Sequence, residues 1–158
     1  MTSPQIQLDK MWEYNVYEYR LNGKDRIKIM CLYKHPKMNI RADFVPQFKT
    51  VLRDKFYLDT CIADPLIIVG DFNIDFNNKD YEYIRQSFQD ELGLRPLFEN
   101  KMTFEYVNKS GSNYVHGFSQ LDWCFTNLSQ NHWNIHGLVY ESWYTDHLPI
   151  MLEVEKIN

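Results

Sequence analysis

Hydrophobic and polar positions alternate in some stretches of the chain and recur at helical spacing in others. Alternation over residues 13–19 and again over 26–33, with an Asn-Gly turn between them, predicts an antiparallel hairpin. Apolar residues at steps of three and four predict two amphipathic helices, one beginning near Arg41 and one ended by Gly93. The residues that mark these helices are Phe44, Phe48, Val51, Leu52 and Phe56 in the first and Tyr81, Ile84, Phe88 and Leu92 in the second.

A continuous apolar run, Leu-Ile-Ile-Val at residues 66–69, is typical of a strand that is covered on both faces. Further strand candidates follow the second helix, at residues 103–107, 121–125, 135–140 and 150–154. With 158 residues the chain fits one domain over its whole length, residues 1–158, and leaves no room for a second full core. The pattern therefore predicts an α/β domain with a mixed β-sheet and two main helices.

The composition is that of a folded domain, with 44% hydrophobic and 24% charged residues, so disorder is not expected. No stretch reaches the roughly 18 apolar residues of a membrane span, and the first residues lack the pattern of a signal peptide. The three cysteines form no CxxC pair and are interpreted as buried free thiols of a reducing compartment. N-x-[ST] triplets at Asn108 and Asn127 favour the opposite interpretation. We expect a cytoplasmic or nuclear protein with no membrane partner.

The net charge of −4 is divided unevenly along the chain. Residues 1–60 carry 11 Lys and Arg against 7 Asp and Glu, whereas residues 61–158 carry 6 against 14. A basic first part can contact a polyanion, and an acidic second part can hold divalent cations. An ordinary solvated surface explains the same numbers, so charge alone does not decide between these interpretations.

Polar side chains follow the strand at 66–69 in the sequence Gly-Asp-Phe-Asn at residues 70–73. α/β proteins usually place their sites just beyond the C-terminal end of a covered strand, and glycine allows the chain to turn there. If the backbone stays extended, Asp71 and Asn73 point the same way, and together they can orient a water and hydrogen-bond a phosphate oxygen. The alternative is an Asx-rich turn, because more Asp and Asn residues follow, up to Asn78.

Two further segments carry ionisable side chains. Asp122 lies inside the apolar strand candidate at 121–125, where an unpaired buried carboxylate is costly, so it needs a partner, either a histidine or a metal ion. Asp146 and His147 come just before the last strand candidate, and imidazole changes its charge near neutral pH. Alone, such an Asp-His pair is more often a surface turn. A contact between Asp122 and His147 would satisfy both residues.

Taken in order, these segments resemble the endonuclease/exonuclease/phosphatase superfamily. The resemblance rests on Gly-Asp-Phe-Asn at 70–73, Leu-Asp-Trp-Cys-Phe at 121–125 and Thr-Asp-His at 145–147, and it extends over nearly the whole chain. The stretch IKIMCLYKHP at 27–36 and the region of Thr103 are similar to the transposon-type branch, which includes endonucleases of mobile elements. The resemblance implies that the chain corresponds to the C-terminal half of a four-layer α/β/β/α sandwich.

The resemblance also implies roles for the matching residues. Asp71 would orient or deprotonate the attacking water, and Asn73 would hold the phosphate and assist in positioning the water. Asp122 would orient His147 and raise its basicity. His147 would hydrogen-bond or protonate the phosphoryl oxygens as negative charge develops on them.

Three more residues receive roles in the same way. Asp146 would bind a divalent cation, Mg²⁺ or Mn²⁺, that neutralises charge in the transition state. Tyr33 and His35 stand where family members contact the phosphate, with a strand-core residue and a loop residue as the respective alternatives. Thr145 replaces the serine of the family pattern, which is a mild change.

We expect the chain to lack an equivalent of the family's N-terminal half, which carries the principal metal-binding glutamate. Glu13 and Glu18 lie on the opening hairpin and do not stand in that context. One carboxylate makes a poor Mg²⁺ site, so the cation is expected to bind weakly. A half sandwich also leaves a sheet face uncovered, for which a homodimer, a partner chain or polar residues would compensate.

Three functions follow from these observations. A divalent-metal-dependent phosphodiesterase of the endonuclease type, acting on nucleic acid, is favoured. A truncated, non-catalytic derivative that binds a partner or nucleic acid is the second. A phosphatase for a small-molecule or lipid phosphate is the third.

Overall fold

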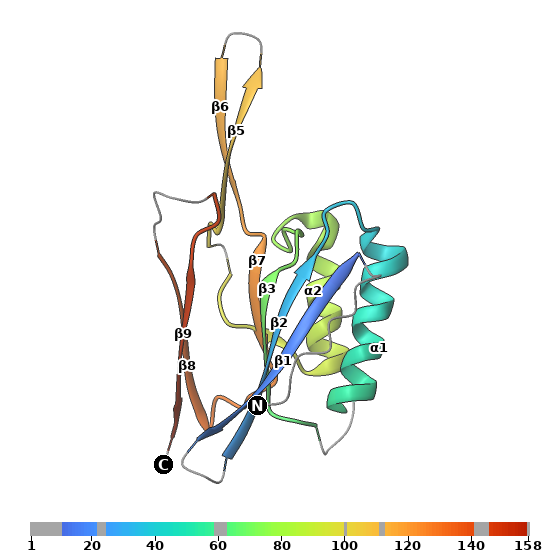
Figure 1. The fold of residues 1–158 in the computed structure, drawn as a ribbon, viewed down its shortest axis with the longest axis vertical. Coiled ribbons are helices and arrows are strands. Elements are labelled where there is room, and N and C mark those ends of the chain that lie inside the picture. The colour runs from blue at the N-terminus through green and yellow to red at the C-terminus, as the bar shows by residue number, and fades with distance from the viewer. Residues whose placement is uncertain are drawn as a thin grey trace.

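The computed structural model describes residues 11–21, 25–58, 63–99, 101–110, 113–140 and 146–157. The main strands are β1 (Trp12–Leu21), β2 (Asp25–Lys34), β3 (Leu66–Asp71), β4 (Arg95–Pro96) and β7 (Asp122–Thr126). They form one sheet in the order β1-β2-β3-β7-β4. Helices α1 (Val45–Phe56) and α2 (Lys79–Leu92) cover one face of this sheet, and β8 (Trp133–Val139) and β9 (Ile150–Lys156) pair as a second, small sheet on the other (Figure 1).

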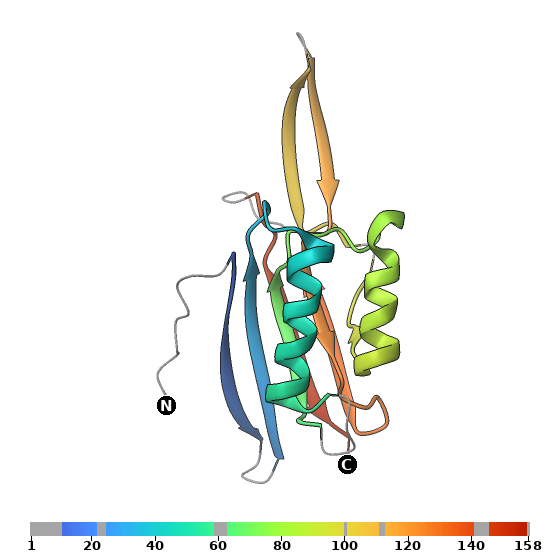
Figure 2. The same ribbon diagram turned by 90° about the vertical axis from the view of Figure 1, so that its right-hand side faces the viewer.

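Two more strands, β5 (Phe104–Ser110) and β6 (Asn113–Ser119), pair with each other as a hairpin. This hairpin projects away from the rest of the molecule (Figure 2). In the main sheet β2 and β3 are parallel, while the β1–β2, β3–β7 and β4–β7 pairs are antiparallel. The predicted mixed sheet with two main helices is confirmed. None of the described helices has the length and hydropathy needed to cross a membrane.

The core between the sheet and the helices is dominated by aromatic rings. Phe44, Phe48 and Phe88 from the helical side are fully buried against Phe72 and Phe125 of the sheet side. Ring centroids in this cluster lie 5.2–6.1 Å apart, mostly in edge-to-face arrangements that aromatic pairs prefer. The helical spacing of apolar residues in the sequence therefore identified the residues that fix both helices to the sheet.

The ends of the helices follow from local chemistry. The first helix opens with a π-helical turn, η1 (Ile40–Phe44), in which the Asn39 side chain accepts the Ala42 N–H at 2.9 Å. The second ends at Gly93, whose φ of 64° is the left-handed conformation of a helix C-cap. The predicted start near Arg41 and the predicted stop at Gly93 are both confirmed.

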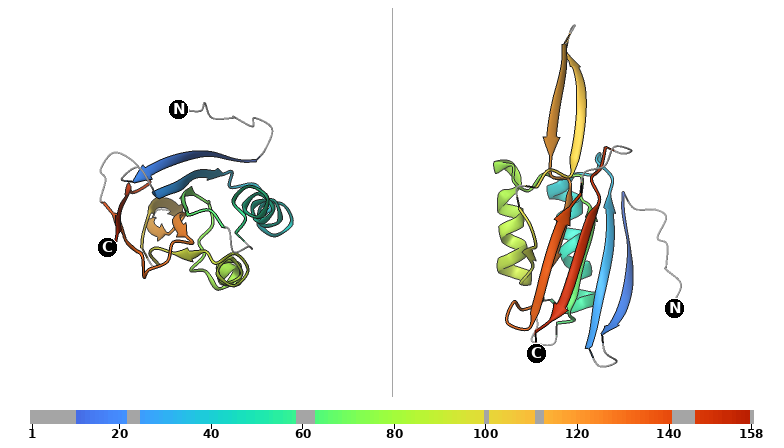
Figure 3. Two further views of the ribbon diagram at one scale, coloured as in Figure 1. Left: turned by 90° about the horizontal axis from the view of Figure 1, so that it is seen from below. Right: turned by 90° about the vertical axis from the view of Figure 1, so that its left-hand side faces the viewer.

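The face opposite the helices is only partly covered. Apolar residues of β8 and β9 pack on Ile27, Ile67 and Cys124 of the sheet. β1 lies to one side of the β8–β9 pair (Figure 3), and its residues Tyr17 and Tyr19 are 53% and 59% exposed. The expected uncovered sheet face is therefore present, and it includes the surface of β1 and the exposed residues Cys31 and Tyr33 of β2.

Several features differ from the sequence-based expectation. β4 was not predicted because two residues are too few for a hydrophobic pattern, and β6 was not predicted because a strand paired only within a projecting hairpin has no buried face to impose one. Cys124 is buried but Cys31 is exposed, so the interpretation of buried thiols is wrong for Cys31. Cys61 and the Asn-Gly turn at 22–24 lie outside the described residues.

Candidate active site

Three candidate side chains lie opposite one another on neighbouring strands. Tyr33 of β2 pairs with Asp71 of β3, and Asp71 pairs with Asp122 of β7. Strand alternation places all three on the face that carries β8 and β9, at the C-terminal ends of β2 and β3. Two carboxylates directly opposite each other repel, so this arrangement needs a compensating positive charge or hydrogen bonds.

Gly70 brings Asp71 close to the neighbouring strand. A Cβ atom at Gly70 would lie 1.9 Å from the carbonyl oxygen of Leu32, so no other residue fits without moving the backbone. The glycine in the 70–73 motif is thus required by the close approach of β3 to β2 directly before Asp71.

Asn73 does not continue the extended backbone that the sequence reading assumed. Its φ of 48° is left-handed, and the chain turns so that Asn73 N donates to Asp71 Oδ1 at 2.8 Å. The side-chain Nδ2 donates to Asp71 Oδ2 at 2.9 Å and to the Lys34 carbonyl at 2.8 Å. Asn73 therefore holds the Asp71 carboxylate in place. The alternative of an Asx turn also describes this region, since Asn77 N donates to Asp75 Oδ1 at 3.0 Å.

Asp122 and His147 form a hydrogen-bonded pair. His147 Nδ1 lies 2.8 Å from Asp122 Oδ2, and the side chains are 37% and 16% exposed respectively. Asp122 is the first residue of β7, and is half-buried rather than enclosed within the strand as expected. Burial lowers the pKa of His147, but the hydrogen bond and charge of Asp122, together with the charges of Asp71 and Asp146, outweigh it and leave the pKa raised.

The Asp71 carboxyl has a raised pKa. Burial is the largest cause and the charge of Asp122 adds to it, while the hydrogen bonds from Asn73 and the charge of His147 act in the opposite direction. Asp71 and His147 therefore influence each other electrostatically although they come from distant parts of the sequence.

Two residues at this end of the sheet were not singled out as site residues by the sequence. Thr103 is completely buried, and its Oγ1 accepts the N–H groups of Leu121 and Asp122. Lys34 is also completely buried, and its Nζ donates to the His35 carbonyl at 3.0 Å. Burial lowers the pKa of Lys34, and the charge of Asp71 partly offsets that shift. The similarity of the Thr103 region to the transposon-type branch was a sequence signal for Thr103. No sequence signal marked Lys34.

The remaining predicted residues lie around this centre. Tyr33 is 41% exposed, so the strand-core alternative is wrong for it. His35 is in the loop after β2, where its Nδ1 accepts the Lys37 N–H at 3.2 Å. Asp146 is exposed, and its carbonyl accepts the Glu105 N–H at 2.9 Å. Thr145 lies outside the described residues.

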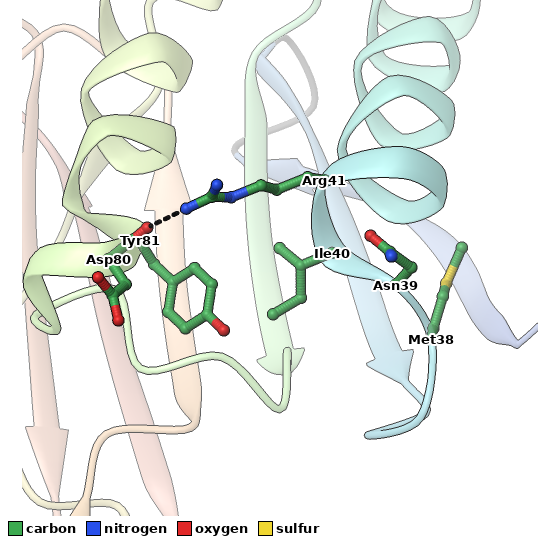
Figure 4. Close-up of a pocket in the computed structure, with 6 residues that line it drawn as sticks. All are labelled: Met38, Asn39, Ile40, Arg41, Asp80 and Tyr81. Atoms are coloured by element: carbon green, nitrogen blue, oxygen red, sulfur yellow. Dashed lines mark hydrogen bonds between the residues drawn. The ribbon is translucent and has the colours of Figure 1, made fainter.

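A cavity of about 490 Å³ opens on the helix side of the molecule, between the start of η1 and the start of α2. Arg41 spans it and donates to the Asp80 carbonyl at 3.3 Å, with Tyr81 and Ile40 below (Figure 4). None of the candidate site residues lines this cavity. It is therefore distinct from the cluster around Asp71.

Three solved structures superpose on nearly all of this chain. D. rerio TDP2 complexed with a single-strand DNA product matches with 13% identity and a TM-score of 0.61. An endonuclease/exonuclease/phosphatase family protein from Leptotrichia buccalis matches with 17% identity and a TM-score of 0.57. A mannosyl-6-phosphatase from Bacteroides thetaiotaomicron matches with 16% identity and a TM-score of 0.55. The chain has the endonuclease/exonuclease/phosphatase fold. The resemblance stated from the sequence is thereby confirmed at the level of the fold.

The match is partial on the side of the solved structures. It covers 98%, 96% and 91% of this chain but 67%, 62% and 56% of TDP2, the Leptotrichia protein and the mannosyl-6-phosphatase. The chain thus spans between half and two thirds of these structures, in agreement with the predicted partial sandwich. A scan against protein-family models and a search of curated proteins gave no match.

Proposed function

We propose that the chain is a phosphodiesterase of the endonuclease type that acts on nucleic acid, with Asp71, Asp122 and His147 as its reaction centre. The observation that carries the proposal is the 2.8 Å contact between Asp122 and His147 beside the Asp71 carboxylate. A carboxylate and an imidazole with shifted pKa values are the groups that general acid–base hydrolysis uses. The presence of this fold in a mannosyl-6-phosphatase and in TDP2 with a DNA product supports chemistry on phosphate esters.

In the proposed reaction Asp71 orients the attacking water or accepts a proton from it. Its raised pKa makes it a stronger base than an ordinary aspartate, and Asn73 holds both carboxylate oxygens. His147 donates to a phosphoryl oxygen as negative charge develops, and its raised pKa increases the protonated fraction near neutral pH. Asp122 accepts from Nδ1 and fixes the orientation of the ring. Tyr33, exposed beside Asp71, contacts the phosphate, as does His35 in the adjoining loop.

The described residues do not by themselves fit a divalent cation. Within them, no three His, Cys, Asp or Glu side chains come together as a metal site, and Asp146 is a single exposed carboxylate. Mg²⁺ is usually held by more than one oxygen ligand and gives up its water reluctantly. We propose that Asp146 binds Mg²⁺ or Mn²⁺ weakly unless a partner chain supplies further carboxylates, and we assign no step of the reaction to the ion.

Nicking of supercoiled plasmid DNA tests the proposed activity. We expect nicking by the wild type in Mg²⁺ or Mn²⁺, its loss after chelation with EDTA, and a fall on the order of 100-fold or more in Asp71→Asn and His147→Gln. Asp75→Asn and His136→Gln are matched controls, because Asp75 only caps a turn and His136 lies exposed on β8. Unchanged nicking in His147→Gln would exclude the proposed mechanism.

A non-catalytic binding protein is the second candidate. Two observations favour it: no metal cluster among the described residues, and the exposed tyrosines Tyr17, Tyr19 and Tyr33 on the uncovered edge of the sheet. We propose that a second copy or a partner chain covers this surface, whether the protein is an enzyme or a non-catalytic binding protein. No nicking by the folded wild type, together with retained binding of single-stranded DNA, would favour this candidate over the enzyme. Light scattering on a size-exclusion column distinguishes a monomer from a dimer.

A phosphatase for small-molecule phosphates is the third candidate, favoured by the match to a mannosyl-6-phosphatase. Release of inorganic phosphate from mannose 6-phosphate, and from a lipid phosphate presented in detergent, measures this activity directly. The variants Asp71→Asn and His147→Gln and the controls Asp75→Asn and His136→Gln are used in this assay as well. Phosphate release without plasmid nicking would move the assignment from phosphodiesters to phosphomonoesters.

A further inference from the structure

Thr103 joins the two segments that carry Asp122 and His147. Its side chain is 0% exposed, and its Oγ1 accepts the N–H of Leu121 at 3.0 Å and of Asp122 at 2.9 Å. Its main-chain carbonyl accepts the N–H of Leu148 at 2.7 Å. One buried residue therefore contacts the backbone at Asp122 and the backbone directly after His147.

The residues that follow Thr103 complete this attachment. Phe104 forms an antiparallel β-bridge with His147, and their ring centroids are 4.9 Å apart. Glu105 N donates to the Asp146 carbonyl at 2.9 Å. The backbone that carries His147 is thus held on both sides of the bridge by the segment that begins at Thr103, whereas Asp122 belongs to the main sheet.

We propose that Thr103 is a positioning residue of the reaction centre, which sets the separation between the Asp122 carboxylate and the His147 imidazole by anchoring both backbone segments. The assignment rests on the function proposed above. The two side chains are 25 residues apart in sequence, and a hydrogen bond between them tolerates only a few tenths of an ångström. A link between their backbones is therefore what keeps the contact at 2.8 Å.

The hydroxyl oxygen, and not the shape of the side chain, makes the Asp122 half of this link, while the main-chain carbonyl makes the His147 half. Thr103→Val keeps the volume and branching but leaves two N–H groups without their acceptor. Thr126 provides a matched control on β7, the strand that begins at Asp122. It is also 0% exposed, and its Oγ1 donates to the Leu66 carbonyl at 2.8 Å and accepts the Leu128 N–H at 3.1 Å. Thr126 lies at the other end of β7 from Asp122.

The experiment compares wild type, Thr103→Val, Thr103→Ser and Thr126→Val by two readouts. The first is kcat and KM for a chromogenic phosphodiester, bis(p-nitrophenyl) phosphate, in Mn²⁺. The second, which needs no activity, is the downfield proton resonance of the hydrogen-bonded His147 Nδ1–H, assigned by its absence in His147→Gln. We expect Thr103→Val to lower kcat on the order of 10- to 100-fold with KM within about twofold, and to lose the resonance.

Thr103→Ser keeps the oxygen and is expected to retain both kcat and the resonance, and Thr126→Val is expected to retain both although it also loses stability. The inference is overturned if Thr103→Val keeps both, or if Thr126→Val loses them equally. If Thr103→Val does not fold, the folded Thr103→Ser variant decides. Loss of the resonance in Thr103→Ser overturns the inference, and its retention supports the inference. If the wild type hydrolyses no phosphate ester, the proposed function fails, while the resonance still decides the role of Thr103.

Discussion

Replacing Gly70 by alanine tests how closely β3 must approach β2 at the reaction centre. The added Cβ would lie 1.9 Å from the Leu32 carbonyl oxygen and 2.7 Å from its carbon, and the φ of 155° is one that residues with a side chain rarely adopt. The strands must separate to relieve the clash. Losing two ladder hydrogen bonds costs about 2 kcal/mol, and backbone strain adds about 1–3 kcal/mol. We expect Gly70→Ala to lower the free energy of unfolding by about 3–5 kcal/mol.

Gly93→Ala is the control for this prediction. Gly93 also has a positive φ, 64°, but a Cβ atom there meets nothing within 4 Å. Only the backbone cost applies, so we expect a loss of about 1–2 kcal/mol. Urea unfolding followed by circular dichroism measures both variants against the wild type. Equal losses in the two variants would refute the reasoning, because the crowding at Leu32 would then carry no cost.

Three further predictions concern stability. Trp123→Phe removes the Nε1 donor to the carbonyls of Ile74 and Gln120, at 3.0 and 2.8 Å, and we expect a loss of about 2–3 kcal/mol in urea unfolding. The pKa of Asp71 is raised in the folded state, so ionisation of its carboxyl group destabilises the wild type as the pH increases above about 4. Asp71→Asn lacks this ionisation, so we expect its free energy of unfolding to rise relative to that of the wild type over the same pH range. A difference in free energy of unfolding between Asp71→Asn and the wild type that stays constant as the pH increases would contradict this prediction. The pKa of His147 is also raised in the folded state, so protonation of His147 stabilises the fold. This stabilisation is complete below about pH 6.5 and is lost as the pH rises through the folded pKa. We therefore expect His147→Gln to lower the free energy of unfolding most at low pH.

Much of the fold is encoded locally and was predictable. The apolar run at residues 66–69 is typical of a covered strand, which the structure confirms, and Phe88, Leu92 and Gly93 mark both the buried face and the end of α2. The contact between Asp122 and His147 was also predicted, on the argument that a carboxylate in an apolar strand needs a partner, although Asp122 stands at the start of β7 and not inside it.

Other parts of the site depend on contacts that no local pattern contains. The left-handed turn at Asn73 is stabilised by the carbonyl of Lys34, which lies 39 residues earlier. Thr103 is an ordinary residue by sequence, and only the hydrogen bonds to Leu121 and Asp122 give it a place in the site. The exposure of Cys31 depends on how far β8 and β9 extend across the sheet, which the strand pattern does not specify.

The β5–β6 hairpin is a projecting arm whose base lies beside His147. Phe104 is the first residue of the hairpin and the bridge partner of His147, and the arm beyond it stands clear of the main sheet. Deleting the arm from Phe104 onward would therefore also remove the bridge to His147, so a deletion that tests the arm alone must leave Phe104 in place.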